Sequence, residues 1–199
     1  MERIKGVRLL DTTQPEAIRR LTDLLNVVYK DRASKGDDYL PAGQDEETTR
    51  LRIEGKEVWV AELGGQIIGT FTLAPPGVSS YSRWLRQNAV AEVSQLAVHQ
   101  DFRMLGIFTL LMEVAEQRAF ELGAVEFAAS AAARQKKLID VYLRRGHRIV
   151  DFKWQKNAAF GIVIFSKTLR QPGIKTPRLH LYFRKFKYCR RFIRYRLLK

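Results

Sequence analysis

The residues best placed to do chemistry form a turn, Arg103-Met-Leu-Gly106, between an apolar run ending at Val98 and an amphipathic stretch over 107–122. If the run is a strand and the stretch a helix, backbone N–H groups at the helix N-terminus face one point and favour an anion there. Gly106 would let a ligand approach the backbone, and the Arg103 guanidinium could bond phosphate oxygens. The spacing indicates a phosphate-binding turn, with a simple helix-starting turn as the alternative.

Hydrophobic periodicity predicts the elements that would position this turn. Apolar residues at helical spacing predict helices over 15–29, 107–122 and 134–145, and a polar loop over 31–44 leads to a shorter helix near 44–52. Apolar runs predict strands over 7–10, 58–62, 67–73, 91–98, 125–130, 149–154 and 159–167. Helices interleaved with hairpins indicate an α/β (α+β) domain with a mostly antiparallel sheet.

Composition sets the class of protein. The chain has 199 residues, of which 46% are hydrophobic and 11% aromatic, enough for one globular domain with a full core. Its longest uncharged stretch, 63–82, is interrupted by Gly, Pro and Ser and is not expected to span a membrane. The first residues do not resemble a signal peptide, and the single cysteine, Cys189, cannot form an internal disulfide. We therefore expect a cytoplasmic protein.

Two motifs resemble those of a known family. The stretch LAVHQDFRMLGIFTLLM, residues 96–112, resembles the acyl-CoA-binding motif of the GNAT superfamily of N-acetyltransferases, in which an L-x-V strand precedes Arg/Gln-x-x-Gly-x-Gly/Ala at a helix start. VYLRRGH, residues 141–147, resembles the family's second signature, a helix ending in L-Y-x-x-x-G-F. The resemblance implies a GNAT-like mixed sheet with splayed central strands flanked by helices.

The same resemblance implies an enzyme that moves an acetyl or other acyl group to an amine acceptor by direct attack, with acetyl-CoA or another acyl-CoA as cosubstrate and no metal. Tyr142 would protonate the departing thiolate, and Glu92 would take a proton from the acceptor ammonium, directly or through water. A packed tyrosine and an ordinary strand glutamate are the alternatives. The donor contacts implied are Leu96, Ala97, Val98, Arg103, Met104, Leu105, Gly106, Ile107, Phe108 and Gln135.

The sequence departs from the family pattern at Phe108, where Gly or Ala is usual, at Gln135, where Asn is frequent, and at His147, where Phe is usual. Phe108 either turns into the core or narrows the pocket, so that the single phosphodiester of an acyl carrier protein fits better than CoA. AEVSQLAV, residues 91–98, also resembles the E-x-S-R-x-A-V strand of acyl-homoserine-lactone synthases and related N-acyl amino acid synthases, with Gln95 in place of their Arg.

Two other functions therefore remain open. The first is a carrier-protein-dependent synthase with a long-chain acyl donor, and the second is a non-catalytic module that binds an acyl-thioester or a membrane surface. The segment 79–86 precedes the central strand and is a candidate contact for the acceptor. The three histidines lack metal-ligand spacing, and no motif suggests a covalent intermediate.

Positive charge is concentrated at the C-terminus. The chain has 35 basic and 21 acidic side chains, and residues 171–199 hold ten of the basic ones and no acidic one. We therefore expect a domain over 1–170 and a tail over 171–199, with a basic amphipathic helix over 178–199. That helix could pack on the domain, dock peripherally on an anionic membrane or bind an acidic acyl carrier protein. Nucleic acid is not expected, because no recognition motif accompanies the charge.

Overall fold

The computed structural model describes residues 6–34, 43–79, 81–154 and 161–169. All of them belong to one compact unit, residues 1–169. The predicted basic tail lies outside the described residues, so its helix and its partners stay predictions.

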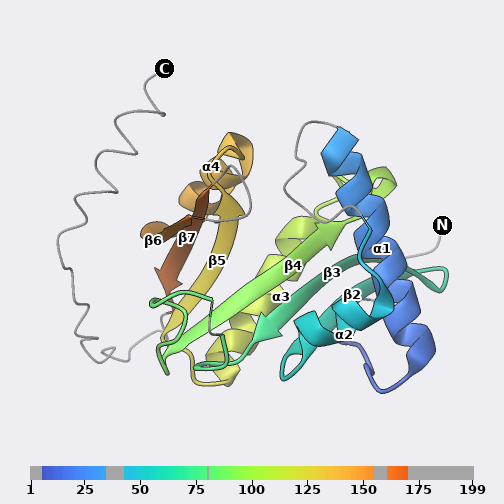
Figure 1. Ribbon diagram of the computed structural model, residues 1–199, viewed down its shortest axis with the longest axis horizontal. Helices are drawn as coiled ribbons and strands as arrows, with labels where there is room; N and C mark the ends of the chain where they lie inside the picture. Colours follow the sequence, from blue (N-terminus) through green and yellow to red (C-terminus); the bar gives the residue numbers. More distant parts are fainter. Residues whose placement is uncertain (1–5, 35–42, 80, 155–160, 170–199) are drawn as a thin grey trace. The chain divides into compact units, whose positions relative to one another are not determined.

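Seven strands form a single sheet in the order β1-β2-β3-β4-β5-β7-β6 (Figure 1). Every neighbouring pair is antiparallel except β4 and β5, which run parallel. The mixed, mostly antiparallel sheet expected from the sequence is confirmed. The strands are β1 (Val7–Leu9), β2 (Glu57–Leu63), β3 (Gln66–Ala74), β4 (Val90–Val98), β5 (Glu126–Ala132), β6 (Arg148–Trp154) and β7 (Gly161–Thr168).

Helices cover both faces of the sheet. The helices α1 (Pro15–Ser34) and α2 (Glu46–Ile53) share one apolar core with Val58 and Val60 of β2. The helices α3 (Ile107–Glu121) and α4 (Lys136–Arg144) share another core, to which Trp59 of β2 packs. Alternate residues of a strand point to opposite faces, so β2 contributes to both cores. Figure 1 shows α1 and α2 in front of the sheet and α3 behind it.

The first helix is longer than the sequence predicts. Periodicity predicts an end near Tyr29, whereas α1 continues to Ser34 and includes the start of the predicted loop. Lys30, Arg32 and Ala33 are good helix formers, and the Asp31 carboxylate is held by an ion pair with Arg103 at 2.7 Å. A distant contact, which periodicity cannot detect, therefore accompanies the extra turn.

A buried carboxylate joins the last strands of the sheet. Glu126 of β5 is 2% exposed and accepts hydrogen bonds from Ser166 Oγ at 2.5 Å and Thr168 Oγ1 at 2.8 Å, both on β7. Arg148 of β6 forms an ion pair with the same carboxylate at 2.8 Å. Buried charges are tolerated when they are paired and hydrogen-bonded, so this cluster fixes β5 to β7 and β6.

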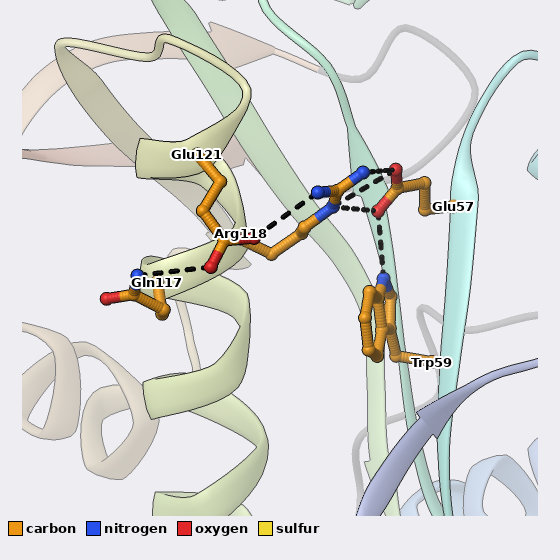
Figure 2. A network of polar contacts seen from close by, with 5 residues as sticks. All are labelled: Glu57, Trp59, Gln117, Arg118 and Glu121. Atoms are coloured by element: carbon orange, nitrogen blue, oxygen red, sulfur yellow. Dashed lines mark hydrogen bonds and ion pairs between the residues drawn. The ribbon is translucent and has the colours of Figure 1, made fainter.

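A second ion pair fixes α3 to the other end of the sheet (Figure 2). The Arg118 guanidinium donates to Glu57 of β2, with distances of 2.7 Å from Nη2 to Oε1 and 2.9 Å from Nε to Oε2. Trp59 Nε1 donates to the same carboxylate at 3.0 Å, and Glu121 accepts from Arg118 Nη1 at 3.2 Å. Two parallel N–H···O bonds make this the geometry in which an arginine–carboxylate pair is strongest.

We predict that Arg118→Met lowers the free energy of unfolding by about 1 kcal/mol at neutral pH, because it removes the bidentate pair. The Arg118 hydrogen bonds hold the pKa of Glu57 below its ordinary 4.5. The pair therefore contributes fully above the unfolded-state pKa, and its contribution disappears as the pH falls through the folded-state pKa. Urea unfolding at about pH 7 and about pH 4 should show the difference between wild type and variant shrinking in acid.

The control is Arg19→Gln, which breaks an exposed pair with Glu16 on α1. It should change stability by at most about 0.5 kcal/mol. A pH-independent loss in Arg118→Met would contradict the assignment of the effect to Glu57.

Candidate active site between β4 and β5

The only parallel pair of the described sheet opens partway along its length. Pairing between β4 and β5 begins at Val90 opposite Glu126 and ends at Val93 opposite Ala129. Both strands continue, β4 as far as Val98, without further pairing between them. Backbone N–H and C=O groups require partners, so the facing edges beyond Val93 can bind an extended ligand. The splayed central strands expected from the sequence are present.

A β-bulge in β4 lies at the start of this opening. The pairing of β3 with β4 shifts between Thr70 and Thr72, and Gln95 has a φ of 47°. The Thr72 hydroxyl donates to Gln95 Oε1 at 2.9 Å. Gln95 Nε2 is buried and has no hydrogen-bond partner in the described part of the chain. An extra residue bends a strand away from its neighbour, which explains why the ladder with β5 ends here.

The opening leads into a cavity of about 640 Å³. This volume is in the range of small-molecule sites, roughly 300–1,000 Å³. The lining residues come from the strands β4, β5 and β7, from three helices and from the loops before β2 and β4: Tyr29, Arg32, Leu51, Arg52, Glu54, Lys56, Val78, Ser79, Tyr81, residues 92–96, residues 130–132, Gln135, Leu138, Tyr142 and Ile162. Glu92, Leu96, Gln135 and Tyr142, all expected at the site, thus share one cavity.

Glu92 is a buried carboxylate at the cavity wall. It is 8% exposed, and its Oε2 accepts a hydrogen bond from Ser79 Oγ at 2.5 Å. Burial raises the pKa of Glu92, while the Ser79 bond and the charge of Lys56 act in the opposite direction. Burial and the Glu92 charge also raise the pKa of Tyr81, which lies at the same wall. A carboxyl group with a raised pKa is suited to exchanging protons near neutral pH.

Tyr142 of α4 lines the same cavity and is 3% exposed. Its ring stacks on Phe165 at 5.2 Å between centroids and meets the edge of His147 at 5.3 Å. Burial, followed by the charge of Lys167, lowers the pKa of His147 to about 4, so this imidazole is neutral at pH 7. A neutral buried ring explains how His147 can occupy a position where a phenylalanine is usual.

The turn before α3 presents its backbone outward. Gly106 caps the helix with a φ of 78°, and an added Cβ there would meet no atom within 4 Å. The Leu110 N–H donates to the Gly106 oxygen at 3.0 Å, but the N–H groups of the first helical turn have no acceptor within the helix. Gly69 of β3 lets the start of α3 pack close to the sheet, because a Cβ at this position would be 2.9 Å from Ile107 Cγ2. The turn is therefore held against the sheet with free donors.

The other residues that the sequence predicts to contact the acyl donor lie in different environments, some exposed and some buried. Met104 and Leu105 are exposed, whereas Ala97 and Ile107 are buried in the two cores. Phe108 packs against the α3 core with Val98 and does not line the cavity, so its ring does not narrow the cavity. Roles in donor binding for these residues stay predictions.

Arg103 has a partner that the sequence does not reveal. Its Nη1 is 2.7 Å from Asp31 Oδ2 on α1. Any bond from Arg103 to a phosphate would therefore use its remaining N–H groups. This pair also ties the turn to the end of α1.

Sequence reasoning did not single out several cavity residues, among them Tyr29, Arg32, Arg52 and Lys56. They come from α1, α2 and the loop that follows, and they lie far from the motifs in sequence. The helical character of residues 30–33 was the available signal for Arg32. Ser79 and Tyr81 do belong to the segment expected to contact the acceptor.

The described residues include no group of three or more His, Cys, Asp or Glu side chains arranged to hold a metal ion. Among the described helices, none combines the length and the apolar character that a membrane span requires.

Comparisons with known proteins agree with this geometry. The model of the acetyltransferase (GNAT) family matches residues 19–147. The ribosomal-protein-S18-alanine N-acetyltransferase of Escherichia coli has a similar structure, with a TM-score of 0.63 and 13% identity over 87% of this chain and 97% of that one. No curated protein sequence matches significantly.

Two further solved structures were determined with a donor-side ligand. An aminoglycoside 6'-N-acetyltransferase complexed with coenzyme A has a TM-score of 0.60 and 13% identity over 83% of this chain and 98% of that one. An Elizabethkingia anophelis GNAT acetyltransferase with acetyl-CoA bound has a TM-score of 0.55 and 15% identity over 83% of this chain and 99% of that one. Since the family model covers more than half of the sequence and the split sheet shares its fold with these enzymes, the chain belongs to the GNAT family of acetyltransferases.

Proposed function

We propose that the protein is an N-acyltransferase that moves an acetyl or other acyl group from acyl-CoA to an amine within the opening between β4 and β5. The observation that carries this proposal is the common cavity, which brings Glu92, Tyr142 and the unpaired edge of β4 together. Family membership supports the same reaction class.

The donor would enter along the opened strands. The unpaired backbone groups of β4 beyond Val93 suit the amide-containing pantetheine arm, which can bond to a strand edge as a neighbouring strand does. The turn at Gly106 suits the phosphates, because its free N–H groups and the helix dipole favour negative charge. The relatives solved with coenzyme A and acetyl-CoA support this donor.

The chemistry needs one base and one acid. Glu92 takes a proton from the acceptor ammonium, and the resulting amine attacks the thioester carbonyl carbon, forming the C–N bond. The C–S bond then breaks, and the Tyr142 hydroxyl gives its proton to the departing thiolate. The attacking nitrogen releases its second proton to water, Tyr142 regains a proton from water, and Glu92 loses its proton to solvent before the next turnover. Both groups line the same cavity, Glu92 from β4 and Tyr142 from α4, so one bound reacting centre could reach both.

We predict that Gly106→Glu abolishes saturable acetyl-CoA binding, because a carboxylate would project from the turn toward the phosphates. Like-charge contact should weaken the affinity by about 100-fold or more. Isothermal titration of the full chain at moderate salt measures this directly and limits nonspecific attraction by the +14 net charge.

The matched control is Gly123→Glu at the other end of α3. Gly123 has a φ of 81° and an equally open surrounding, so the backbone strain and the added charge are the same. Only the change at Gly106 should remove binding. Unchanged affinity in Gly106→Glu contradicts the phosphate assignment, and absent binding in the wild type favours a carrier-protein donor or a non-catalytic module.

We predict that Glu92→Gln lowers kcat by roughly 100- to 10,000-fold, the range for loss of a general base. The wild-type rate should fall as the pH is lowered through the raised Glu92 pKa, since only the carboxylate accepts the proton. The variant should lose this acid limb while binding acetyl-CoA normally. A variant that keeps the acid limb would show that another group provides the base.

We predict that Tyr142→Phe lowers kcat by roughly 100-fold with little change in acetyl-CoA affinity, because the ring and its stacking on Phe165 remain. A donor with a more acidic thiol leaving group needs less protonation and should recover most of the rate. Steady-state rates with the two donors test this. Equal losses with both donors would indicate a packing role instead of acid catalysis.

A further inference from the structure

One side of the cavity is lined by three basic side chains whose role the transfer chemistry does not explain. Arg32 comes from the last turn of α1, Arg52 from α2, and Lys56 from the loop before β2. All three are half-buried. They belong to the part of the cavity built by α1 and α2, while Gln135 and Tyr142 belong to the part built by α4.

These charges lack carboxylate partners among the residues that the structure describes. Among the residues that the structure describes, every other half-buried Arg or Lys forms an ion pair with Asp or Glu: Arg20, Arg103, Arg118, Arg145, Arg148 and Lys167. Arg32, Arg52 and Lys56 form none within the same described ranges. Partly desolvated charges are costly when unpaired, so an anionic ligand in the cavity would stabilise them.

The contacts that these side chains do make are with neutral groups. Arg52 Nη1 donates to the side-chain oxygen of Gln44, and Lys56 Nζ donates to the Arg52 carbonyl oxygen at 2.7 Å. Such bonds orient the cations without neutralising them. Glu54 also lines the cavity near these cations, but its side chain is exposed and forms no ion pair with Arg32, Arg52 or Lys56 in the described part of the chain.

The charges extend along the wall toward Glu92. The Lys56 charge acts on the Glu92 carboxyl, and the charges of Arg52 and Arg32 act on the Tyr29 hydroxyl, where they oppose the effect of burial on its pKa. A molecule whose amine faces Glu92 would therefore have its other end beside the cations. Arginine forks bind carboxylate and phosphate oxygens bidentately.

We propose that the acceptor is a small amine that carries an anionic group, a carboxylate or a phosphate ester, bound by Arg52, Arg32 and Lys56. This assignment rests on the proposed function, because it places the reacting amine at Glu92. The cations select the acceptor and hold its amine at the base, and they do not take part in the proton transfers.

The test compares matched amines with the full chain and acetyl-CoA. One pair is O-phosphoethanolamine and ethanolamine, which distinguishes a phosphate, and another is 4-aminobutyrate and butylamine, which distinguishes a carboxylate. We expect kcat/KM for the anionic member of one pair to be roughly 10- to 100-fold higher, the value of a hydrogen bond to a charged group. Arg52→Gln and Lys56→Gln should each remove most of this preference while the acetyl-CoA affinity stays unchanged.

The matched control is Arg50→Gln, two residues away on α2, where the side chain is exposed and does not line the cavity. Because the whole chain carries +14, general attraction would favour anions in every variant, and this control should keep the preference. If a substitution in α2 destabilises the fold, Arg32→Gln tests the same prediction from a different helix, α1.

Four outcomes would overturn the proposal. Equal rates within both pairs, or no turnover of either anionic amine with acetyl-CoA bound normally, refute the acceptor assignment and leave the donor site intact. Weakened acetyl-CoA binding in Arg52→Gln and Lys56→Gln would assign the cations to the donor instead. Absence of acetyl-CoA binding by the wild type contradicts the proposed function itself and removes the basis of this inference.

Discussion

The structure depends on the point at which β4 stops pairing with β5. From Val90 to Val93 the parallel ladder holds the two halves of the sheet together. Beyond Val93 the two strands separate, next to the bulge at Gln95. Opening a ladder leaves backbone donors and acceptors without partners, which is unfavourable unless a ligand satisfies them. The proposed donor site is therefore a direct consequence of the unpaired backbone groups at the opening, and the surrounding side chains supply the acid and the base that the reaction needs.

Each strand at the opening needs support from its outer side. Glu126 ties β5 to β7 and β6 through buried hydrogen bonds, and Arg118 ties α3 to β2 through Glu57. The Arg103–Asp31 pair ties the turn at the helix start to α1. These charged contacts join elements distant in sequence, so the elements around the opening are held to one another even though β4 and β5 do not pair there. Catalytic groups need such support to keep their geometry.

Much of the fold could be predicted from the sequence, because local patterns determine it. The order of strands and helices, and the positions of Glu92, Gly106 and Tyr142, follow from periodicity and two motifs. The full length of α1 and the cations Arg32, Arg52 and Lys56 could not be predicted, since tertiary contacts between distant segments place them. The same holds for Phe108, which is partly buried against the α3 core through packing that a motif does not encode.

Donor binding in the opening between β4 and β5 can be tested by hydrogen exchange of the backbone amides, measured with and without acetyl-CoA. Acetyl-CoA should slow exchange at residues 94–97 of β4 and 106–109 at the start of α3, because the donor bonds to groups that β5 and the helix leave unpaired. Exchange on the outer strands β1 and β6 should stay the same. Protection elsewhere, or none at these two segments under saturating acetyl-CoA, would contradict donor binding in the opening between β4 and β5.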